Sequence, residues 1–346
     1  MMTDTIQKVA WKSASNIALV KYWGKHSEQI PMNPSISITL ENANTQTSIQ
    51  YNKSNGSDVK VDFLFEGNRK PEFGQKIERF IARIAKDYPL LNEFSYIIES
   101  SNSFPHSTGI ASSASSMSAL AMNLYSILRE HGAIASEDLS IASSMSRLGS
   151  GSACRSVYPG FAVWGNSEIV DGSHDEYAVE VNEKIHEEFK NTHDSILIVD
   201  SAKKSVSSTE GHALMAGHSF RESRIKQSHD NLKVLMQALE GGDWHKFTEI
   251  VELEALTLHA LMMSSVPSYI LLHPNTLKVI ELIREFRNAT STAMAFTLDA
   301  GPNIHLLYPD YNAGAVKSFI NDALIQYCEE RKVLHDKAGQ GPEKLI

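Results

Sequence analysis

The chain has 346 residues, of which 42% are hydrophobic, so it is long enough to bury one large core or two closely joined ones. Its 41 acidic and 32 basic residues give a net charge of −9, which argues against the broad basic face that binding to a nucleic-acid backbone requires. The two cysteines, Cys154 and Cys328, are too few and too far apart in sequence for a disulfide framework.

The sequence shows no targeting or membrane-spanning segment. Its first residues, MMTDTIQKVAWKSAS, lack the apolar core of a signal peptide, and no later segment offers about 18 uninterrupted apolar residues. Membrane insertion is therefore not expected, and the small number of cysteines fits a reducing cytoplasm.

The amino-terminal third is predicted to form a sheet. Strand-like runs occur at NIALVKYW, SISITL, TSIQY and VDFLF, separated by turn-forming Pro, Asn and Gly. A helical pattern at residues 74–86 and the strand SYIIES come next.

A loop rich in glycine and serine follows, SNSFPHSTGIASSAS, and from Met117 onward apolar residues recur at helical spacing. Such a loop at the start of a helix lets backbone N–H groups approach a phosphate, and the helix dipole favours the anion. The alternative is an ordinary helix capped by serine, and this loop alone supports both interpretations equally. The sequence GxxxxGK followed by Ser or Thr does not occur, which argues against a P-loop.

The motif GSGSACRS, residues 149–156, is a second candidate and follows a short helix predicted at 137–146. Its two serines and Arg155 can donate several hydrogen bonds to one anion, and the arginine can do so as a planar fork. An ordinary polar turn before the strand FAVW is the alternative. A loop rich in Asp, Glu and His then leads to the strand SILIVD, and a domain boundary is expected at 192/193.

The second half is predicted to be mainly helical before it returns to strands. A helix at 220–240 is closed by two glycines, and Asp243 is the expected N-cap of the next helix. A helix at 276–286, the strand AMAFTL, the turn DAGPN and the strand IHLLY follow. The chain is then expected to end in a helix at 313–330 and a frayed tail, HDKAGQGPEKLI.

Two further segments could reach a common cleft. In the turn DAGPN, Asp299 could accept a proton or orient a hydroxyl if a cation such as Arg155 lay nearby. A plain β-turn is the favoured interpretation from these residues alone, since all of them form turns. In NIALVKYWGK, Lys21 and Lys25 could both reach the cleft from a strand end, although surface lysines are far commoner. The 14 histidines lack zinc-ligand spacing.

Together these segments resemble the mevalonate diphosphate decarboxylases of the GHMP kinase superfamily. The shared stretches are SNIALVKYWGK, PMNPSISITL, FPHSTGIASSAS, GSGSACRSVYPGFAVW, KKSVSSTEGH and FTLDAGPN, and the joint presence of GSGSACRS and DAGPN separates this family from other GHMP kinases. The resemblance implies an α+β GHMP kinase fold. A ribosomal S5 domain 2-like, ATP-binding part at 1–192 would face a ferredoxin-like part at 193–346 across the active-site cleft.

The resemblance also implies roles for individual residues. Asp299 is similar to a catalytic carboxylate beside the tertiary hydroxyl of the substrate, Arg155 to a residue that holds the substrate carboxylate or Asp299, and Lys21 to a catalytic or Asp-orienting lysine. Binding of the substrate and its diphosphate is implied for Tyr22, Lys25, Ser150, Ser152, Arg155 and Ser219. The ATP phosphates would lie at Ser107, Gly109, Ser112 and Ser113, and magnesium would arrive with ATP and take Ser113 as a ligand.

The implied reaction is the ATP-dependent decarboxylation of mevalonate 5-diphosphate to isopentenyl diphosphate by way of 3-phosphorylation, in a homodimer. His106, Ser107 and Thr108 make the loop more polar than the family sequence FPTAAGLASSA, and Phe220 stands where some bacterial relatives have arginine. A mevalonate or phosphomevalonate 3-kinase and a phosphomevalonate decarboxylase are the alternatives within the superfamily. A non-catalytic metabolite sensor of the same fold is the alternative from another class, although the three catalytic residues are present.

Overall fold

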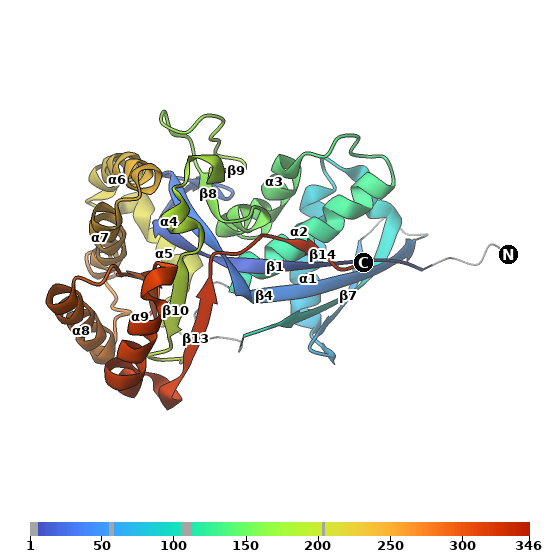
Figure 1. Ribbon diagram of the computed structural model, residues 1–346. Coiled ribbons are helices and arrows are strands. Elements are labelled where there is room, and N and C mark those ends of the chain that lie inside the picture. The colour runs from blue at the N-terminus through green and yellow to red at the C-terminus, as the bar shows by residue number, and fades with distance from the viewer. Residues whose placement is uncertain (1–5, 55–58, 105–111, 203–204) are drawn as a thin grey trace.

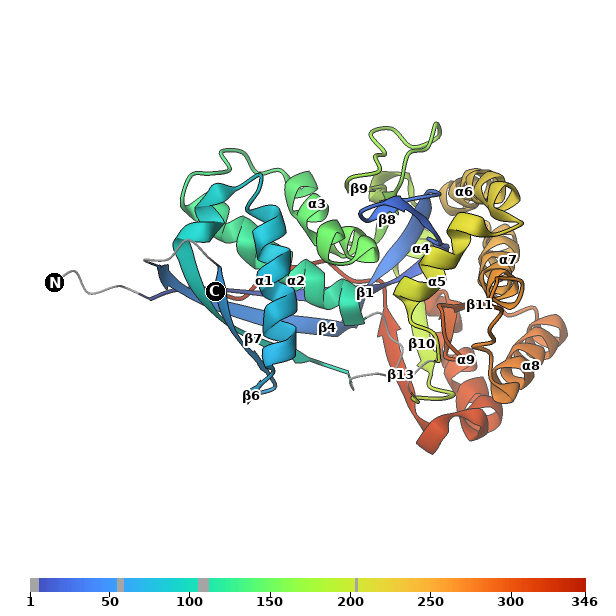
Figure 2. The same cartoon turned by 180° about the vertical axis from the view of Figure 1, so that it is seen from behind.

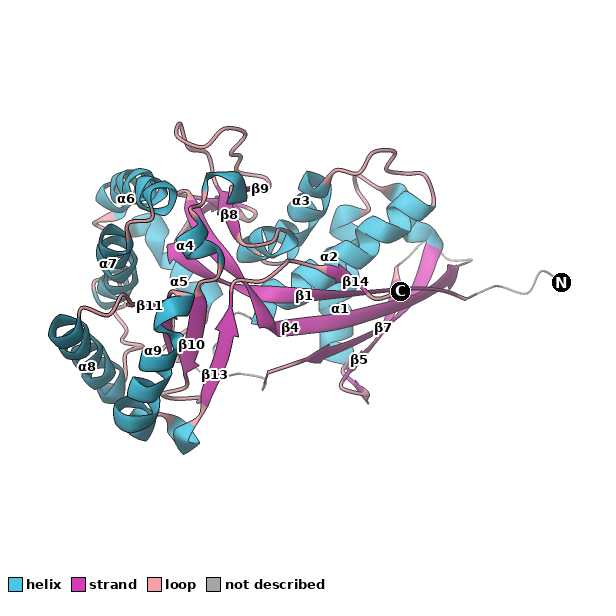
Figure 3. Ribbon diagram, viewed as in Figure 1, coloured by secondary structure: helices cyan, strands magenta, loops and turns pink. Residues whose placement is uncertain are grey.

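Two β-sheets arranged along the length of the molecule form the frame of the fold, and helices cover each of them (Figures 1 and 2). The computed structural model describes residues 6–54, 59–104, 112–202 and 205–346. Helices and strands occur in both halves of the chain (Figure 3), in agreement with the expected α+β class. None of the described helices has the length and apolarity needed to cross a membrane.

The larger sheet is built mainly from the first third of the chain, as the strand-like runs predict. Its strands are β1 (Gln7–Val20), β4 (Ser35–Lys53), β5 (Lys60–Phe65), β6 (Asn68–Arg69), β7 (Phe94–Asn102), β8 (Phe161–Trp164), β9 (Ala178–Glu180) and β14 (Glu343–Lys344). The main path runs β14-β1-β4-β7-β5-β6, and β8 and β9 extend from β4. Neighbouring strands are antiparallel except β5 and β7, which are parallel.

One long strand, β4, replaces the two strands expected at SISITL and TSIQY. It pairs with β1 along most of its length, and residues 40–43 bulge from the ladder. The carboxylate of Asp336 accepts hydrogen bonds from the N–H groups of Glu41, Asn42 and Ala43. These three backbone donors of the bulge are therefore satisfied, and the strand continues through a segment whose residue types favour a turn.

Three helices pack on this sheet: α1 (Pro71–Ile84), α2 (Ser112–Glu130) and α3 (Leu139–Gly149). α2 lies at their centre and is buried on nearly every face between Ala114 and Leu128. The helix predicted from Met117 is confirmed, and within the described residues it already begins at Ser112. The loop at 105–111, on which the phosphate-binding prediction partly rests, lies outside the described residues.

The smaller sheet belongs to the second half and has the antiparallel order β11-β12-β10-β13. Its strands are β10 (His193–Leu197), β11 (Ala295–Leu298), β12 (Ile304–Tyr308) and β13 (Val333–Lys337). The helices of this half are α4 (Glu187–Lys190), α5 (Ser208–Leu214), α6 (Arg221–Gly241), α7 (Trp244–Met263), α8 (Pro274–Thr290) and α9 (Ala313–Phe319). A separate hairpin joins β2 (Lys25–Ser27) to β3 (Ile30–Pro31).

The junction between α6 and α7 is as predicted. Gly242 ends α6 in the left-handed conformation, with φ of 73°, which a glycine adopts without the steric cost of a side chain. Asp243 caps α7, because its side chain accepts a hydrogen bond from the N–H of Lys246. These two signals define the short connection between α6 and α7. The two helices pack against each other, and a side chain from each contacts the backbone of Lys21.

The carboxy-terminal predictions are wrong in two respects. α9 ends at Phe319, and the chain continues through a π turn at Ile320–Leu324 instead of one helix to residue 330. The tail expected to fray is ordered, because β13 joins the smaller sheet and β14 pairs with the free edge of β1. Strand addition satisfies backbone groups of an exposed edge that no local sequence pattern reveals.

Candidate active site

A cleft of about 280 Å³ lies where segments from both halves of the chain meet. The expected residues that line it are Lys21, Tyr22, Lys25, Ser113, Ser150, Ser152, Arg155 and Asp299. They come from the end of β1, the β2–β3 hairpin, the first turn of α2, the segment after α3 and the turn between β11 and β12. The structure thus brings together four motifs that are far apart in sequence.

An ion pair between Lys21 and Asp299 crosses the cleft floor. Lys21 Nζ lies 3.1 Å from Asp299 Oδ1 and also donates a 2.6 Å hydrogen bond to the carbonyl oxygen of Ala18. Lys21 is 2% exposed, whereas Asp299 is 32% exposed and faces the cleft. Burial lowers the pKa of Lys21, and the Asp299 carboxylate opposes that shift. The carboxylate is therefore oriented by a cation and remains accessible to a bound hydroxyl group.

The position of Asp299 is also held from the backbone side. His259 on α7 is buried, and its Nε2 lies 3.1 Å from the carbonyl oxygen of Asp299, so the ring donates in the tautomer protonated at Nε2. The DAGPN turn is thus anchored by a helix of the second half as well as by Lys21 of the first. A plain surface turn would lack both contacts.

Arg155 lies in a 3₁₀ turn (Gly151–Val157) and is only 2% exposed. Its Nε donates to Ser37 Oγ at 2.9 Å, Nη1 to Ser35 Oγ at 2.6 Å and Nη2 to Asn16 Oδ1 at 3.3 Å. Burial lowers the pKa of Arg155, and the charge of Asp299 opposes that shift. Because the three acceptors are neutral oxygens, they orient the guanidinium without cancelling its charge. Arg155 can therefore attract an anion in the cleft.

Tyr22 presents a buried hydroxyl that has no hydrogen-bond partner among the described residues. Burial raises the pKa of Tyr22, so the group remains a neutral donor. Its ring packs edge-on against Trp164 and lies 4.3 Å from the His212 ring, centroid to centroid. An unpaired buried hydroxyl costs about 1–3 kcal/mol. A ligand oxygen in the cleft would satisfy it.

His212 on α5 is a lining residue that the sequence interpretation did not single out. Its Nδ1 accepts a 2.9 Å hydrogen bond from the N–H of Gly24, and burial, helped by the charge of Lys25, lowers the pKa of His212 to about 3. The ring is therefore neutral at physiological pH and carries its proton on Nε2. Gly24 has φ of +100°, and a Cβ there would lie 2.6 Å from Met32 Sδ, so the turn requires glycine.

Ser219 is the described binding candidate that the structure places elsewhere. It lies in an exposed turn before α6, next to Phe220, which is 56% exposed. Ser208 and Thr209, from the first turn of α5, line the cleft instead. A capping box between Ser207 and Glu210 fixes the start of α5. Ser208 and Thr209 both belong to the stretch KKSVSSTEGH, which the chain shares with the family.

A second, mainly apolar cavity of about 460 Å³ adjoins the cleft and shares Ser113 with it. Its walls include Phe63, Phe65, Phe73, Lys70, Lys76, Ile98, Met117 and Leu120, together with Ser112 and Ser116 from the first turn of α2. An aromatic base fits such walls, and its phosphates would reach the amino-terminal end of α2. The alternation of Phe63 and Phe65 in VDFLF is the signal that could have indicated this wall.

Only some of the residues expected to bind the ATP phosphates lie in the part of the chain that the structure describes. Ser107 and Gly109 lie outside the described residues. Ser113 stands at the junction of the two cavities, where Ser150 Oγ donates to Ser113 Oγ at 3.3 Å. The described residues contain no group of three or more His, Cys, Asp or Glu side chains able to hold a metal ion. Mg²⁺ commonly keeps several water ligands and binds through substrate phosphates rather than through an all-protein cage.

Comparisons with known proteins agree with this architecture. Residues 13–178 match the family of diphosphomevalonate decarboxylase-like N-terminal domains, and residues 195–344 match the mevalonate 5-diphosphate decarboxylase C-terminal domain. The diphosphomevalonate decarboxylase of Candida albicans is 30% identical over 88% of this chain and 85% of its own. The predicted boundary at 192/193 falls between the two matches and stays a prediction.

Solved structures show the same relationship. The mevalonate diphosphate decarboxylase from Staphylococcus aureus is 28% identical, with a TM-score of 0.86 over 99% of both chains. A structure described as MDDEF in complex with MVAPP, AMPPCP and magnesium is 27% identical, with a TM-score of 0.82 over 99% of both chains. The resemblance inferred from the motifs is confirmed, and the chain belongs to the diphosphomevalonate decarboxylase family.

Proposed function

We propose that this chain uses ATP to convert mevalonate 5-diphosphate to isopentenyl diphosphate, carbon dioxide, ADP and phosphate, phosphorylating the 3-hydroxyl before decarboxylation. Family membership supports this activity. The observation that carries it is the ion pair of Lys21 with Asp299 at 3.1 Å, in a cleft also lined by Arg155 and Ser113. A proton acceptor (Asp299), a cation that can bind an anion (Arg155) and a serine at the proposed phosphate site (Ser113) thus line the same cleft.

Asp299 is suited to the first step. The tertiary hydroxyl of the substrate is a poor leaving group, so its oxygen must first attack the terminal phosphorus of ATP. As the new O–P bond forms, the bond from the terminal phosphorus to the bridging oxygen breaks and ADP leaves. Asp299 accepts the hydroxyl proton, and Lys21 keeps the carboxylate directed at the hydroxyl oxygen. Positioning and electrostatic stabilisation supply most of the catalysis in phosphoryl transfer, which a preoriented ion pair serves well.

Arg155 is suited to bind the substrate carboxylate before the second step. When the C3–O bond breaks, phosphate leaves, and the electrons of the C1–C2 bond form the new C2–C3 double bond as carbon dioxide departs. Positive charge that develops at C3 is tolerated beside the Asp299 carboxylate. Arg155, held by neutral oxygens, fixes the carboxylate until the bond breaks.

ATP binding is assigned to the apolar cavity and to the first turn of α2. The base would contact the aromatic walls, and the phosphates would reach Ser112 and Ser113 beside the cleft. Magnesium neutralises charge on the phosphates when bound. Ser107 and Gly109 remain predicted phosphate ligands on the strength of the family resemblance.

Replacing Lys25 with alanine is expected to raise KM for the diphosphate substrate by about tenfold or more while kcat changes little, because hydrogen bonds to charged groups contribute about 1.5–3 kcal/mol. Lys25 lines the cleft and is half-buried, which lowers its pKa. Steady-state kinetics at varied substrate measure the effect. Lys246→Ala on the surface of α7 is the control. A fall in kcat at unchanged KM would place Lys25 at the reacting atoms instead.

The direct test of the proposed function is a product analysis. The protein is incubated with magnesium, ATP and either mevalonate 5-phosphate or its 5-diphosphate, and carbon dioxide, ADP and free phosphate are measured. Equal amounts of all three from the diphosphate are expected. ADP without carbon dioxide would indicate a 3-kinase, and preference for the monophosphate would indicate a phosphomevalonate decarboxylase. Absence of turnover with every substrate would favour the metabolite sensor.

A cellular location and an oligomeric state are also proposed for the protein. A reducing, cytoplasmic location is supported by the two cysteines, which are buried free thiols whose pKa values burial raises, to about 12 for Cys154 and about 11 for Cys328. A homodimer is proposed from the family resemblance. Analytical ultracentrifugation at micromolar concentration would decide between a dimer and a monomer.

A further inference from the structure

The backbone of Lys21 is held by a buried ion pair from the other half of the chain. The N–H of Lys21 donates to Glu254 Oε2 at 2.8 Å, and Arg224 Nη2 donates to the carbonyl oxygen of Lys21 at 2.9 Å. Arg224 and Glu254 also bind each other through two hydrogen bonds of 2.6 Å. Their side chains are 2% and 0% exposed. Both backbone groups of the cleft lysine are thus bound by one salt bridge.

The location of Lys21 explains why such a contact is needed. Lys21 is the first residue after β1, whose ladder with β4 ends at Val20. A buried N–H or carbonyl group that has left its ladder must find another partner. Arg224 on α6 and Glu254 on α7 provide these partners, and Asn33 Nδ2 also donates to the carbonyl oxygen of Lys21 at 2.9 Å. Asn231 Nδ2 in turn donates to Glu254 Oε1 at 2.6 Å. The pair therefore replaces a neighbouring strand at the point where β1 enters the cleft.

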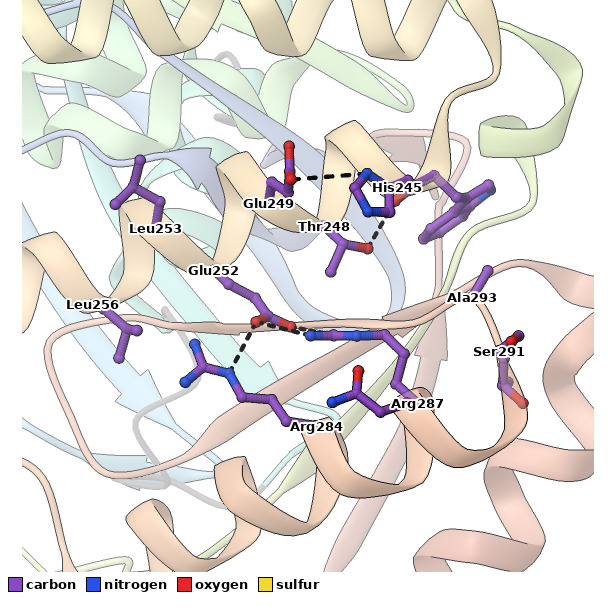
Figure 4. Close-up of a pocket in the computed structure, with 13 residues that line it drawn as sticks. His245, Thr248, Glu249, Glu252, Leu253, Leu256, Arg284, Arg287, Ser291 and Ala293 are labelled. Atoms are coloured by element: carbon purple, nitrogen blue, oxygen red, sulfur yellow. Dashed lines mark hydrogen bonds and ion pairs between the residues drawn. The ribbon is translucent and has the colours of Figure 1, made fainter.

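Stability alone does not account for this pair. Removing two charges from water costs several kcal/mol per ion, and replacing a buried ion pair by apolar residues of similar volume is often neutral or stabilising. A second cluster on α7 offers a comparison. Glu252 binds Arg284 and Arg287 beside a groove of about 840 Å³ between α7 and α8 (Figure 4). Neither of these arginines nor Glu252 lines the cleft that contains Lys21.

We propose that the Arg224–Glu254 ion pair is a positioning device that fixes the backbone of Lys21 so that Nζ reaches Asp299. This inference rests on the proposed function, because it assumes that the Lys21–Asp299 pair takes part in phosphoryl transfer. It assigns Arg224 and Glu254 as positioning residues, since they act through Lys21 and lie beneath the cleft. It also makes the packing of α6 and α7 against β1 a requirement for activity.

The ion pair also affects the charge of Lys21. Burial lowers the pKa of Lys21, the Asp299 and Glu254 carboxylates oppose that shift, and Arg155 adds to it. His305 on β12 also interacts electrostatically with Lys21, and the Arg224 guanidinium contacts the carbonyl oxygen of Lys21. Because the protonated lysine orients Asp299, activity should be lost as the pH rises through the pKa of Lys21. Removing the charge of Glu254 lowers that pKa, so the loss of activity should begin at a lower pH.

The test compares Glu254→Gln with Glu252→Gln, two equivalent changes two residues apart on α7. Glu254→Gln should lower kcat by about 10- to 100-fold, the scale expected for misplacement of a catalytic group, while KM for ATP changes little. The alkaline limb of its pH–rate profile should move to lower pH. Glu252→Gln should keep the kcat and the pH profile of the wild type. Thermal unfolding of both variants measures the loss of stability.

A second variant distinguishes the loss of Lys21 positioning from a general loss of folding. Arg224→Met combined with Glu254→Met fills the site with apolar side chains and should remain folded. It leaves the N–H of Lys21 without its acceptor, and the carbonyl oxygen of Lys21 keeps only the hydrogen bond from Asn33 Nδ2. It should be as slow as Glu254→Gln. Wild-type turnover in this double variant, or equal loss of kcat in Glu252→Gln and Glu254→Gln, would overturn the inference. Failure of the wild type to release carbon dioxide would overturn the proposed function instead.

Discussion

Replacing Asp299 with asparagine is expected to lower kcat by about 1,000-fold, the scale that a positioned general base contributes. The amide has nearly the same shape and can still accept a hydrogen bond from Lys21, but it cannot take up the proton of the substrate hydroxyl. ADP formation in a single turnover measures the loss at the phosphoryl-transfer step itself. Binding of ATP, followed calorimetrically, and the unfolding temperature should change little, because Asp299 is partly exposed and does not line the apolar cavity.

Asp310→Asn is a matched control for that prediction. Asp310 also pairs with a basic side chain, His193, but it is 75% exposed and does not line the cleft. Its replacement should leave kcat unchanged. Near-normal turnover in Asp299→Asn would contradict the assigned role, and the ion pair with Lys21 would then be structural.

The second large effect is expected for Arg155→Lys, which should lower kcat/KM for the diphosphate substrate by about 100-fold, the loss of one charge-assisted hydrogen-bonding fork. Lysine keeps the positive charge but cannot donate to Ser35, Ser37 and Asn16 together while facing the cleft. The unfolding free energy should also fall by about 1–3 kcal/mol, because buried polar partners are left unpaired. Kinetics must therefore be measured well below the unfolding temperature.

Separate measurement of ADP formation and carbon dioxide release distinguishes the two possible roles of Arg155. If it holds the substrate carboxylate, Arg155→Lys should slow carbon dioxide release at least as much as ADP formation, and KM should rise. If it acts mainly on Asp299, ADP formation should be slowed with KM unchanged. Arg287→Lys, in the Glu252 cluster outside the cleft, controls for the loss of a partly buried arginine. Wild-type kcat/KM in Arg155→Lys would exclude both roles.

The electrostatic design of the cleft follows from its burial. Lys21 and Arg155 are withdrawn from water, so their charges are weakly screened and act strongly on a bound anion. His212 and Tyr22 remain neutral for the same reason, and both can donate hydrogen bonds without adding charge. The cleft thus combines two buried cations and the half-buried Lys25 with neutral donors, although the chain as a whole carries a net charge of −9.

Local sequence patterns determined the features that depend on neighbouring residues. The helical spacing after Met117, the glycine that ends α6 and the cap at Asp243 could be read directly, because caps and periodicity involve contacts within a few residues. Six shared stretches indicated the family, and the joint presence of GSGSACRS and DAGPN separated it from other GHMP kinases. They also named Arg155 and Asp299, though a short motif cannot show that the two face one cleft.

Only the tertiary structure decided which residues meet. Lys21 and Asp299 are separated by 278 positions, and Lys21 and Glu254 by 233, so their contacts depend on how β1 packs against the second half. Glu254 stands out as a charge in an apolar helix, but its partner on α6 cannot be read from the sequence. The same limit applies to Ser208, which lines the cleft, and to the strand β14, which adds to β1. Each of these contacts is formed by long-range packing, whereas local patterns encode only the conformation of the segment that contains them.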